Sequence, residues 1–213
     1  IVLAPYSVQE YADFAPLAFD LAEKYRNPVV VASDGTIAKM MENVELPEKI
    51  NPTTRFDWAC DGINGRGHHN DITTCGDGPE QWERFNLDLQ AKYSLIKENE
   101  QRWEEMMTED ADIIMVAFGS LARVCIDTVK TARENGMKVG LIRPITLWPF
   151  PEKAFEKFEG KDTKFFVTEL NAGQMVDDVK IAVNDKKKVE FYGRLGCIPT
   201  PAELYNKLCE LYK

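Results

Sequence analysis

The second half of the chain alternates between short apolar runs and amphipathic stretches. The apolar runs are continuous and bounded by turn residues, as is typical of buried strands; they lie at residues 113–118, 138–142, 165–168 and 189–192. After the first run, Gly119-Ser120 leads into a stretch of helical period that ends at Gly136. Strands alternating with helices in this way predict an open, mostly parallel α/β sheet with helices on both faces. We expect this domain to run from residue 110 to residue 213.

The first 45 residues contain one β-α-β unit. Two short apolar runs of strand type flank a helix that begins at the capping box Ser7-Val8-Gln9-Glu10 and runs to about Tyr25, with a kink expected at Pro16. Two short strands and one helix cannot enclose a core. Residues 1–45 are therefore the end of a larger α/β domain or an appendage of the next one. Because a strand is already under way at Ile1, which is not a methionine, we expect the native chain to begin upstream.

A linker loop and a long helix occupy residues 46–109. The loop at 51–78 is rich in glycine and lacks any periodicity, and a stretch of this kind is usually functional or poorly ordered. Pro79 then opens a helix that we expect to end near Met107. Its apolar side is marked by Trp82, Phe85, Leu89, Ile96 and Trp103.

The charge balance is acidic. The 213 residues include 26 lysines and arginines against 35 aspartates and glutamates, which gives a formal net charge of −9. Nucleic acid and anionic membranes both need a basic face, so neither is an expected partner. No apolar run approaches the roughly 18–20 residues of a membrane span. The five cysteines are odd in number and widely spaced, which favours reduced thiols in a cytoplasmic protein over a disulfide framework.

Three motifs suggest ligand chemistry, and each has a simpler structural interpretation. Gly119-Ser120 lies at a strand–helix junction, where free amides can bind an anion, but Ser120 as a simple helix cap is favoured because no Gly-x-Gly-x-x-Gly follows. Gly76-Asp77-Gly78, with Asn99 downstream, resembles the start of the metal and diphosphate motif of thiamine-diphosphate enzymes. The charged helix between them does not fit that motif, so a simple turn is favoured. A zinc site is disfavoured because the chain has no Cys-x-x-Cys pair; its candidate ligands are Cys60, His68, His69 and Cys75.

Polar and aromatic side chains follow two of the predicted strands. Ligands and partners gather at the carboxyl edges of open α/β sheets, and the candidates there are Arg143, Thr146, Trp148, Glu169, Asn171 and Gln174. The guanidinium of Arg143 can hold a carboxylate or phosphate, or form a structural ion pair, for which Glu169 is the suggested partner. Trp148-Pro149-Phe150 is an apolar loop that suits the core or a subunit interface.

Several runs of sequence resemble a known enzyme family. These are Lys138–Pro151, Thr168–Asp178, Val189–Arg194, Ile1–Glu10 and Tyr25–Val29, and they are similar to the alpha-type subunit of 2-oxoacid:ferredoxin oxidoreductases. The resemblance covers nearly the whole chain except the loop from Asn51 to Gly78. Around residues 98–112 it is greatest to the branched-chain, 2-oxoisovalerate enzymes.

The resemblance implies a multi-subunit enzyme. The native subunit would start with a pyrimidine-binding thiamine-diphosphate domain, of which residues 1–45 are the end, and finish with a domain like the carboxyl-terminal domain of transketolase. A beta-type subunit would carry the diphosphate and Mg²⁺, and ferredoxin-like subunits would carry iron–sulfur clusters. The holoenzyme would decarboxylate a 2-oxoacid oxidatively, with ferredoxin and coenzyme A as further substrates.

The family's activating glutamate falls upstream of Ile1, so the resemblance assigns no catalytic, cofactor-binding or metal residue to this chain. We expect the chain to be inactive alone, to bind no thiamine diphosphate and to serve assembly. Two alternatives stay open: a module that binds an anion or coenzyme A at its strand ends, and a transketolase-like or dehydrogenase component that works without ferredoxin.

Overall fold

The computed structural model describes residues 1–46, 56–73, 78–185 and 188–212. The chain divides into two compact units. The first combines residues 1–46 with the chain from residue 96 onward, and the second spans residues 47–95. No helix in the described ranges has the length and apolar character that a membrane crossing requires.

The amino-terminal segment folds as the capping box predicts. The strand β1 (Val2–Leu3) leads to the helix α1 (Val8–Tyr25), whose cap Ser7 accepts a hydrogen bond from the N–H of Glu10 at 3.1 Å. The Glu10 carboxylate in turn accepts the N–H of Tyr6 at 3.0 Å, which ties down the chain before the helix. The helix is unbroken at its internal proline. The strand β2 (Val30–Val31) and the short 3₁₀ helix η1 (Ile37–Lys39) complete the segment.

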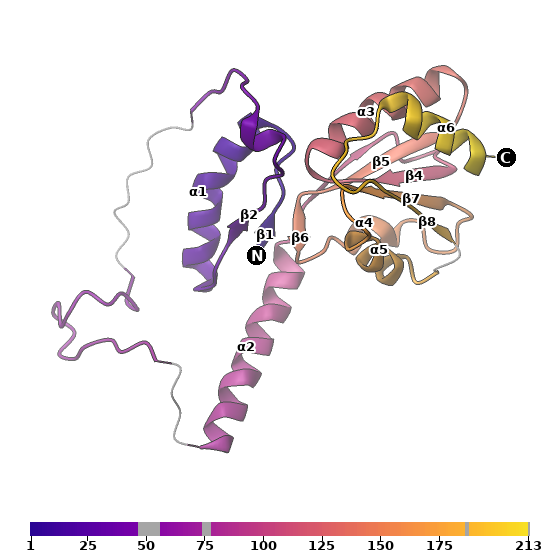
Figure 1. Cartoon of the computed structure of the whole chain (residues 1–213). Helices are drawn as coiled ribbons and strands as arrows, with labels where there is room; N and C mark the ends of the chain where they lie inside the picture. Colours follow the sequence, from indigo (N-terminus) through magenta and orange to yellow (C-terminus); the bar gives the residue numbers. More distant parts are fainter. Residues whose placement is uncertain (47–55, 74–77, 186–187, 213) are drawn as a thin grey trace. The chain divides into compact units, whose positions relative to one another are not determined.

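Three strands form a small sheet in the order β2-β1-β6 (Figure 1). β1 runs parallel to β2 and antiparallel to β6 (Thr146–Trp148), which comes from the second half of the chain. Where a loop was expected, β6 is therefore a strand. The amino-terminal segment and the second half of the chain share this sheet.

The main sheet has five strands in the order β3-β5-β4-β7-β8. All neighbours are parallel except β3, which is an antiparallel edge strand on β5. The bounds are β3 Trp103–Met106, β4 Ile113–Val116, β5 Val139–Pro144, β7 Lys164–Glu169 and β8 Val189–Gly193. The prediction of an open, mostly parallel α/β sheet is confirmed.

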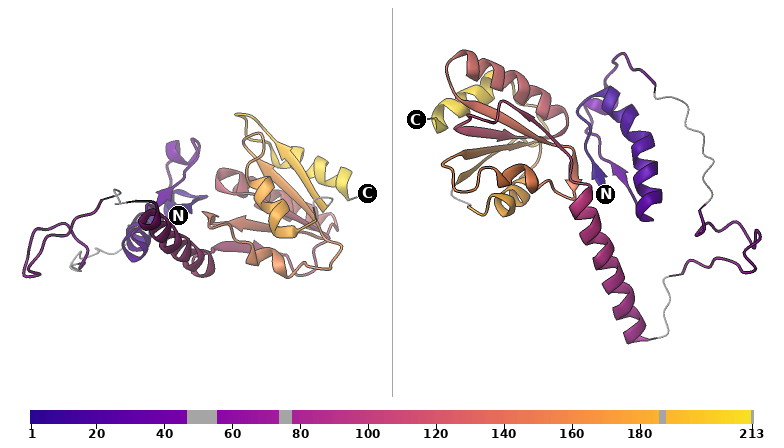
Figure 2. Two further views of the ribbon diagram at one scale, coloured as in Figure 1. Left: turned by 90° about the horizontal axis from the view of Figure 1, so that it is seen from below. Right: turned by 180° about the vertical axis from the view of Figure 1, so that it is seen from behind.

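Helices cover both faces of this sheet (Figure 1 and Figure 2). The bounds are α3 Gly119–Glu134 and α6 Pro201–Leu211 on one face, and α4 Lys153–Glu156 and α5 Met175–Val183 on the other. Successive residues of the central strands alternate between the two cores: Phe165 packs beneath α4 and α5, and Phe166 packs beneath α3 and α6. Both faces are apolar because both are covered.

The prediction of one helix from Pro79 to near Met107 is wrong. The helix α2 spans Pro79–Asn99, and the strand β3 begins after three further residues, at Trp103. β3 is an edge strand with two exposed glutamates. Because these polar residues resemble those of the helix before them, the sequence does not show where the helix ends. Residues 103–106 form a strand because they pair with β5, so tertiary context overrides local propensity here.

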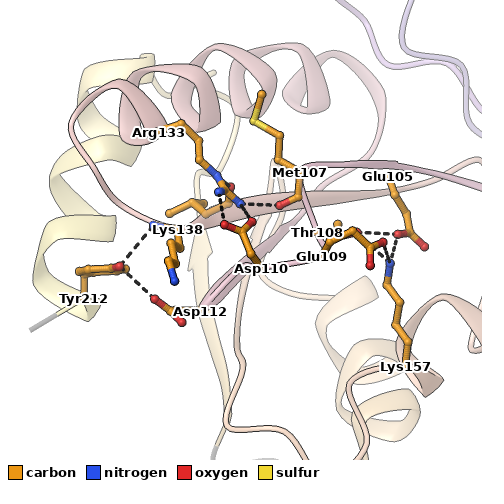
Figure 3. A network of polar contacts seen from close by, with 11 residues as sticks. Glu105, Met107, Thr108, Glu109, Asp110, Asp112, Arg133, Lys138, Lys157 and Tyr212 are labelled. Carbon is orange, nitrogen blue, oxygen red and sulfur yellow. Dashed lines mark hydrogen bonds and ion pairs between the residues drawn. The ribbon is translucent and has the colours of Figure 1, made fainter.

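A polar network secures the edge of the sheet at which β4 begins (Figure 3). Arg133 of α3 holds the Asp110 carboxylate with two nitrogens, at 3.0 and 2.8 Å, and donates to the carbonyl of Met107 at 2.6 Å. The hydroxyl of Tyr212 donates to Asp112 at 3.0 Å, which fastens the end of α6. The ammonium of Lys157 contacts Glu105, Thr108 and Glu109.

Short-range contacts fix the described loop of the second unit. Phe56 and Trp58 stack with ring centroids 5.0 Å apart. Arg66 pairs with Asp61, and the side chain of Asn70 donates to the carbonyl of Ala59 at 3.0 Å. These contacts join residues at most 11 positions apart, so residues 56–73 hold a local shape of their own.

Gly140 tests the packing of β5. A Cβ at this position would lie 2.6 Å from the carbonyl oxygen of Met107 and 3.0 Å from the Ile114 side chain. Because the first contact is with backbone, we expect Gly140→Ala to lower the free energy of unfolding by about 1–3 kcal/mol. Gly35→Ala is the matched control, since a Cβ there meets nothing within 4 Å. Urea denaturation that gives both variants the same stability would contradict this account.

Candidate functional site

Arg143 is the buried centre of an ion cluster at the end of β5. Its terminal nitrogens hold the two carboxylate oxygens of Glu10 at 3.0 and 2.7 Å, and its Nε donates to Glu104 at 3.0 Å. The guanidinium also lies over the ring of Tyr6, 4.2 Å from its centroid. The whole residue is 1% exposed.

This cluster joins the amino-terminal segment to the main sheet. Glu10 belongs to the first turn of α1, Arg143 to β5 and Glu104 to the edge strand β3. A buried guanidinium is tolerated only when its charge and donors are satisfied, and the two-nitrogen grip on a carboxylate does this best. We call the Arg143–Glu10 pair the clamp. The suggested pairing of Arg143 with Glu169 is wrong, because β4 lies between their strands and each side chain has other partners.

The other candidates after β5 also contact neighbouring parts of this unit. Thr146 is fully buried, and its hydroxyl accepts the N–H of Arg102 at 3.0 Å. Trp148 is half-buried in β6 and pairs with Val2 of β1. Phe150 is 8% exposed and packs in the core beneath α4 and α5.

The candidates after β7 form a separate group at the start of α5. Glu169 is 1% exposed, and its carboxylate accepts the N–H groups of Gln174, Met175 and Val176 at 2.9–3.3 Å. Asn171 adds a side-chain donor at 3.1 Å. This carboxylate satisfies the free amides and the positive end of the helix dipole from inside the protein. A role toward a ligand or another subunit stays a prediction, both for the candidates after β5 and for those after β7.

The strand–helix junction at Gly119-Ser120 does bind an anion, but the anion is Asp34 of the same chain. The Ser120 N–H donates to one carboxylate oxygen of Asp34 at 2.6 Å, and the N–H groups of Thr36 and Ile37 donate to the other at 2.9 and 3.1 Å. Ser120 is not the helix cap, because Phe118 occupies that position without a side-chain hydrogen bond. Gly119 has a φ of 62°, and a Cβ there would lie 2.7 Å from the carboxylate.

These contacts set the charge state of Asp34. Burial alone would raise the pKa of this carboxyl group, but the backbone donors of Ser120, Ile37 and Thr36 outweigh it. The pKa of Asp34 therefore lies below its ordinary value. The ionised form is favoured in the folded protein, as expected for a carboxylate at a helix amino terminus.

Two more carboxylates tie the amino-terminal segment to the rest of the unit. Glu42 pairs with Arg123 of α3 at 2.7 Å, and this hydrogen bond lowers the pKa of Glu42. Glu100 is 3% exposed and accepts from Lys24 and Tyr25 at 2.7 and 2.6 Å. Sequence reasoning recognised Glu10 only as a helix cap and missed Asp34 and Glu42. No local signal marks their long-range contacts, since the partners in the second half of the chain lie 81–133 positions away.

The described residues offer no metal site. No group of three or more histidine, cysteine, aspartate or glutamate side chains comes together within them. Of the suggested zinc ligands, Cys60 donates to the carbonyl of Asn70 at 3.5 Å. Cys75 and the Gly76-Asp77 part of the suggested diphosphate motif lie outside the described residues. Asn99 is the last residue of α2.

Two protein-family models match the chain. The one described as pyruvate flavodoxin/ferredoxin oxidoreductase, thiamine diphosphate-binding, matches residues 1–58. The one described as pyruvate:ferredoxin oxidoreductase core domain II matches residues 111–203. Glu10 lies in the first matched region and Arg143 in the second, so the clamp connects the two.

Curated relatives match most of the chain. It is 42% identical over 197 residues to ketoisovalerate oxidoreductase subunit VorB of Methanothermobacter marburgensis, which covers 92% of this chain and 55% of that protein. It is 32% identical over 235 residues to 2-oxoglutarate synthase subunit KorA of the same organism, which covers 98% of this chain and 63% of that protein. The chain spans about half the length of the curated relatives it matches.

One solved structure shares the fold over the full length of the chain. It is the 2-oxoglutarate:ferredoxin oxidoreductase from Magnetococcus marinus with 2-oxoglutarate, coenzyme A and succinyl-CoA bound. The TM-score is 0.78 at 22% sequence identity, and the match covers 100% of this chain and 42% of that chain. The arrangement of the described elements is therefore that of a known fold.

Loss of the clamp should be costly. We expect Arg143→Met to lower the free energy of unfolding by about 3–5 kcal/mol, because it leaves the Glu10 carboxylate partly buried without its cation. The double variant with Glu10→Gln should recover part of this loss, since both charges are then gone. Lys207→Met is the control, because its pair with Glu210 is exposed and should contribute little to stability. Urea denaturation in which Arg143→Met and Lys207→Met cost the same would exclude the clamp.

Asp34 should make the unit sensitive to acid. A group whose folded pKa is depressed stabilises the fold above its unfolded pKa, here about 3.8, and loses that contribution as the pH falls through the folded value. We expect Asp34→Asn to lower stability at pH 7 by about 1–3 kcal/mol, because one of the two accepting oxygens becomes an amide nitrogen that cannot accept a backbone N–H. The gap to wild type should shrink as the pH falls below about 4. The control Asp127→Asn, on an exposed part of α3, should follow wild type, and a gap independent of pH would refute this assignment.

Proposed function

Because the chain belongs to the 2-oxoacid:ferredoxin oxidoreductase family, we propose that it is part of a subunit that serves the oxidative decarboxylation of a 2-oxoacid. In the reaction the 2-oxoacid loses CO₂, its acyl group passes to coenzyme A, and two electrons pass one at a time to ferredoxin. The observation that carries the proposal is the 42% identity to a ketoisovalerate oxidoreductase subunit over 92% of the chain.

The proposed substrate is a branched-chain 2-oxoacid, 2-oxoisovalerate. Identity to the ketoisovalerate oxidoreductase subunit is 42%, against 32% to the 2-oxoglutarate synthase subunit. The two substrates differ in their side chains: that of 2-oxoisovalerate is short and apolar, and that of 2-oxoglutarate ends in a second carboxylate. The difference in identity favours the apolar one.

The chemistry itself belongs to other parts of the enzyme. The proposed holoenzyme contains thiamine diphosphate with Mg²⁺ on a beta-type subunit and iron–sulfur clusters on ferredoxin-like subunits, and it works in the cytoplasm. The described residues of the segment matched to the thiamine-diphosphate family do not fit the cofactor by themselves. Three of their carboxylates, Glu10, Asp34 and Glu42, are held by donors of this chain.

The contribution of this chain is structural positioning. Residues 1–45 are proposed to be the end of the pyrimidine-binding domain, and residues 110–213 an assembly domain. The clamp, the β1–β6 pairing and the Asp34 contact hold one against the other. A cofactor does the difficult chemistry only when the protein positions its reactive atom. The strand-end residues named above are proposed to serve this positioning and assembly.

The holoenzyme purified with its partner subunits tests this function. We expect coenzyme A-dependent reduction of ferredoxin with 2-oxoisovalerate, at a kcat/KM about 10–200-fold above that for 2-oxoglutarate. A preference for 2-oxoglutarate would overturn the substrate assignment and leave the family role intact. Turnover that reduces NAD⁺ and never ferredoxin would favour a dehydrogenase component instead.

The isolated chain provides the complementary measurement. We expect titration calorimetry with thiamine diphosphate and Mg²⁺ to give no heat of binding to the chain alone, whereas the holoenzyme should bind. Micromolar binding by the isolated chain would show that its own residues form a cofactor site.

A further inference from the structure

A hollow of about 590 Å³ lies at the carboxyl edge of the main sheet. One wall is formed by the segment 34–40 of the amino-terminal part, and the other by Leu170 and residues 196–198, which follow β7 and β8. This volume is in the range of sites that receive a large side chain or a small ligand.

Both walls are held in place by hydrogen bonds. On one side, Asp34 is fixed to the amino terminus of α3, and Met40 lies 3.3 Å from a guanidinium nitrogen of Arg123. On the other side, Arg194 donates its N–H to the carbonyl of Glu169 at 3.0 Å and its side chain to Glu203 at 2.6 Å. The hollow is therefore a preformed feature of the unit and can bind without rearranging.

Several large apolar side chains around the hollow are exposed to solvent. Met41 is 96% exposed and follows directly on a lining residue, and Leu195 is 75% exposed and precedes one. Ile198, within the lining, is 41% exposed. Single exposed apolar residues are ordinary, but several around one preformed hollow are typical of a protein interface.

The rim carries one lysine, Lys39, on a chain that is acidic overall, and the lining also includes the carboxylate of Asp34. Lys39 lines the hollow, and among the described residues no acid is paired with it. The nearest carboxylate of the lining, Asp34, already accepts three backbone donors. The formal charge of the whole chain is −9. A complementary partner would therefore present an apolar side chain next to a carboxylate.

We propose that this hollow is the docking site for an acidic segment of a partner subunit, with an apolar side chain between the two walls and a carboxylate on Lys39. A small metabolite inside the hollow would leave Met41 and Leu195 in water, whereas a protein segment would cover them. The inference rests on the proposed multi-subunit function. It adds the place on this chain at which one partner binds.

Cys197 reports directly on this site. It lines the hollow and is an exposed free cysteine. Alkylation by N-ethylmaleimide, followed by peptide-resolved mass spectrometry, is measured on the isolated chain and on the purified holoenzyme. We expect Cys197 to react at least about tenfold more slowly in the holoenzyme. Equal rates would overturn the inference, and so would protection in the isolated chain that grows with its concentration, since a second copy would then be the occupant.

Surface variants test the chemistry of the partner. We expect Leu195→Glu and Lys39→Glu to weaken binding of the partner subunits by about tenfold or more, with circular dichroism unchanged because both residues are on the surface. The matched controls are Ile181→Glu, at an exposed apolar position of α5, and Lys130→Glu, at an exposed position of α3. Assembly that is equally sensitive to the controls would overturn the inference.

The two proposals can fail separately. A holoenzyme that oxidises 2-oxoisovalerate but leaves Cys197 reactive would refute the docking site alone. A complex that protects Cys197 and is disrupted by Lys39→Glu, but has no 2-oxoacid activity, would refute the function and support the docking site.

Discussion

The burial of one guanidinium organises the junction in this molecule. Arg143 is almost wholly removed from water, so the fold is stable only if both carboxylate oxygens of Glu10 reach it. Glu10 also anchors the chain before α1, which links the start of that helix to the position of β5. Two further contacts belong to the same junction: β1 pairs with β6, and the ring of Tyr6 packs on the guanidinium of Arg143. These features depend on one another, because each fixes the geometry that the next one needs.

The same principle applies at the carboxyl edge of the main sheet. In open α/β folds this edge commonly receives anionic ligands at helix amino termini. Here the amino terminus of α3 donates to the carboxylate of Asp34 and that of α5 donates to the carboxylate of Glu169, both from the same chain. The protein has thus used two sites of ligand type to fix its own parts. What stays open at that edge is an apolar hollow with a lysine on its rim, which suits a protein partner better than a phosphate.

The matches to two protein-family models give the junction a context. The clamp connects the region matched to a thiamine-diphosphate-binding family with the region matched to core domain II. A cofactor domain must be held at a fixed orientation to act on its substrate. A buried, two-nitrogen ion pair provides that orientation more sharply than apolar packing, because it fixes both direction and distance. In the proposed enzyme this chain therefore contributes geometry, and the reacting groups lie elsewhere.

The sequence alone determined the elements whose signal is local. The apolar runs gave four strands of the main sheet, the helical stripe gave α3, and the capping box gave the start of α1, since each depends on residues a few positions apart. Tertiary structure decided β3 and β6, whose polar or short sequences become strands only beside β5 and β1. It also decided the partners of Glu10, Asp34 and Arg143. Those pairs are 133 and 86 positions apart, and no local pattern encodes which charges meet once the chain has folded.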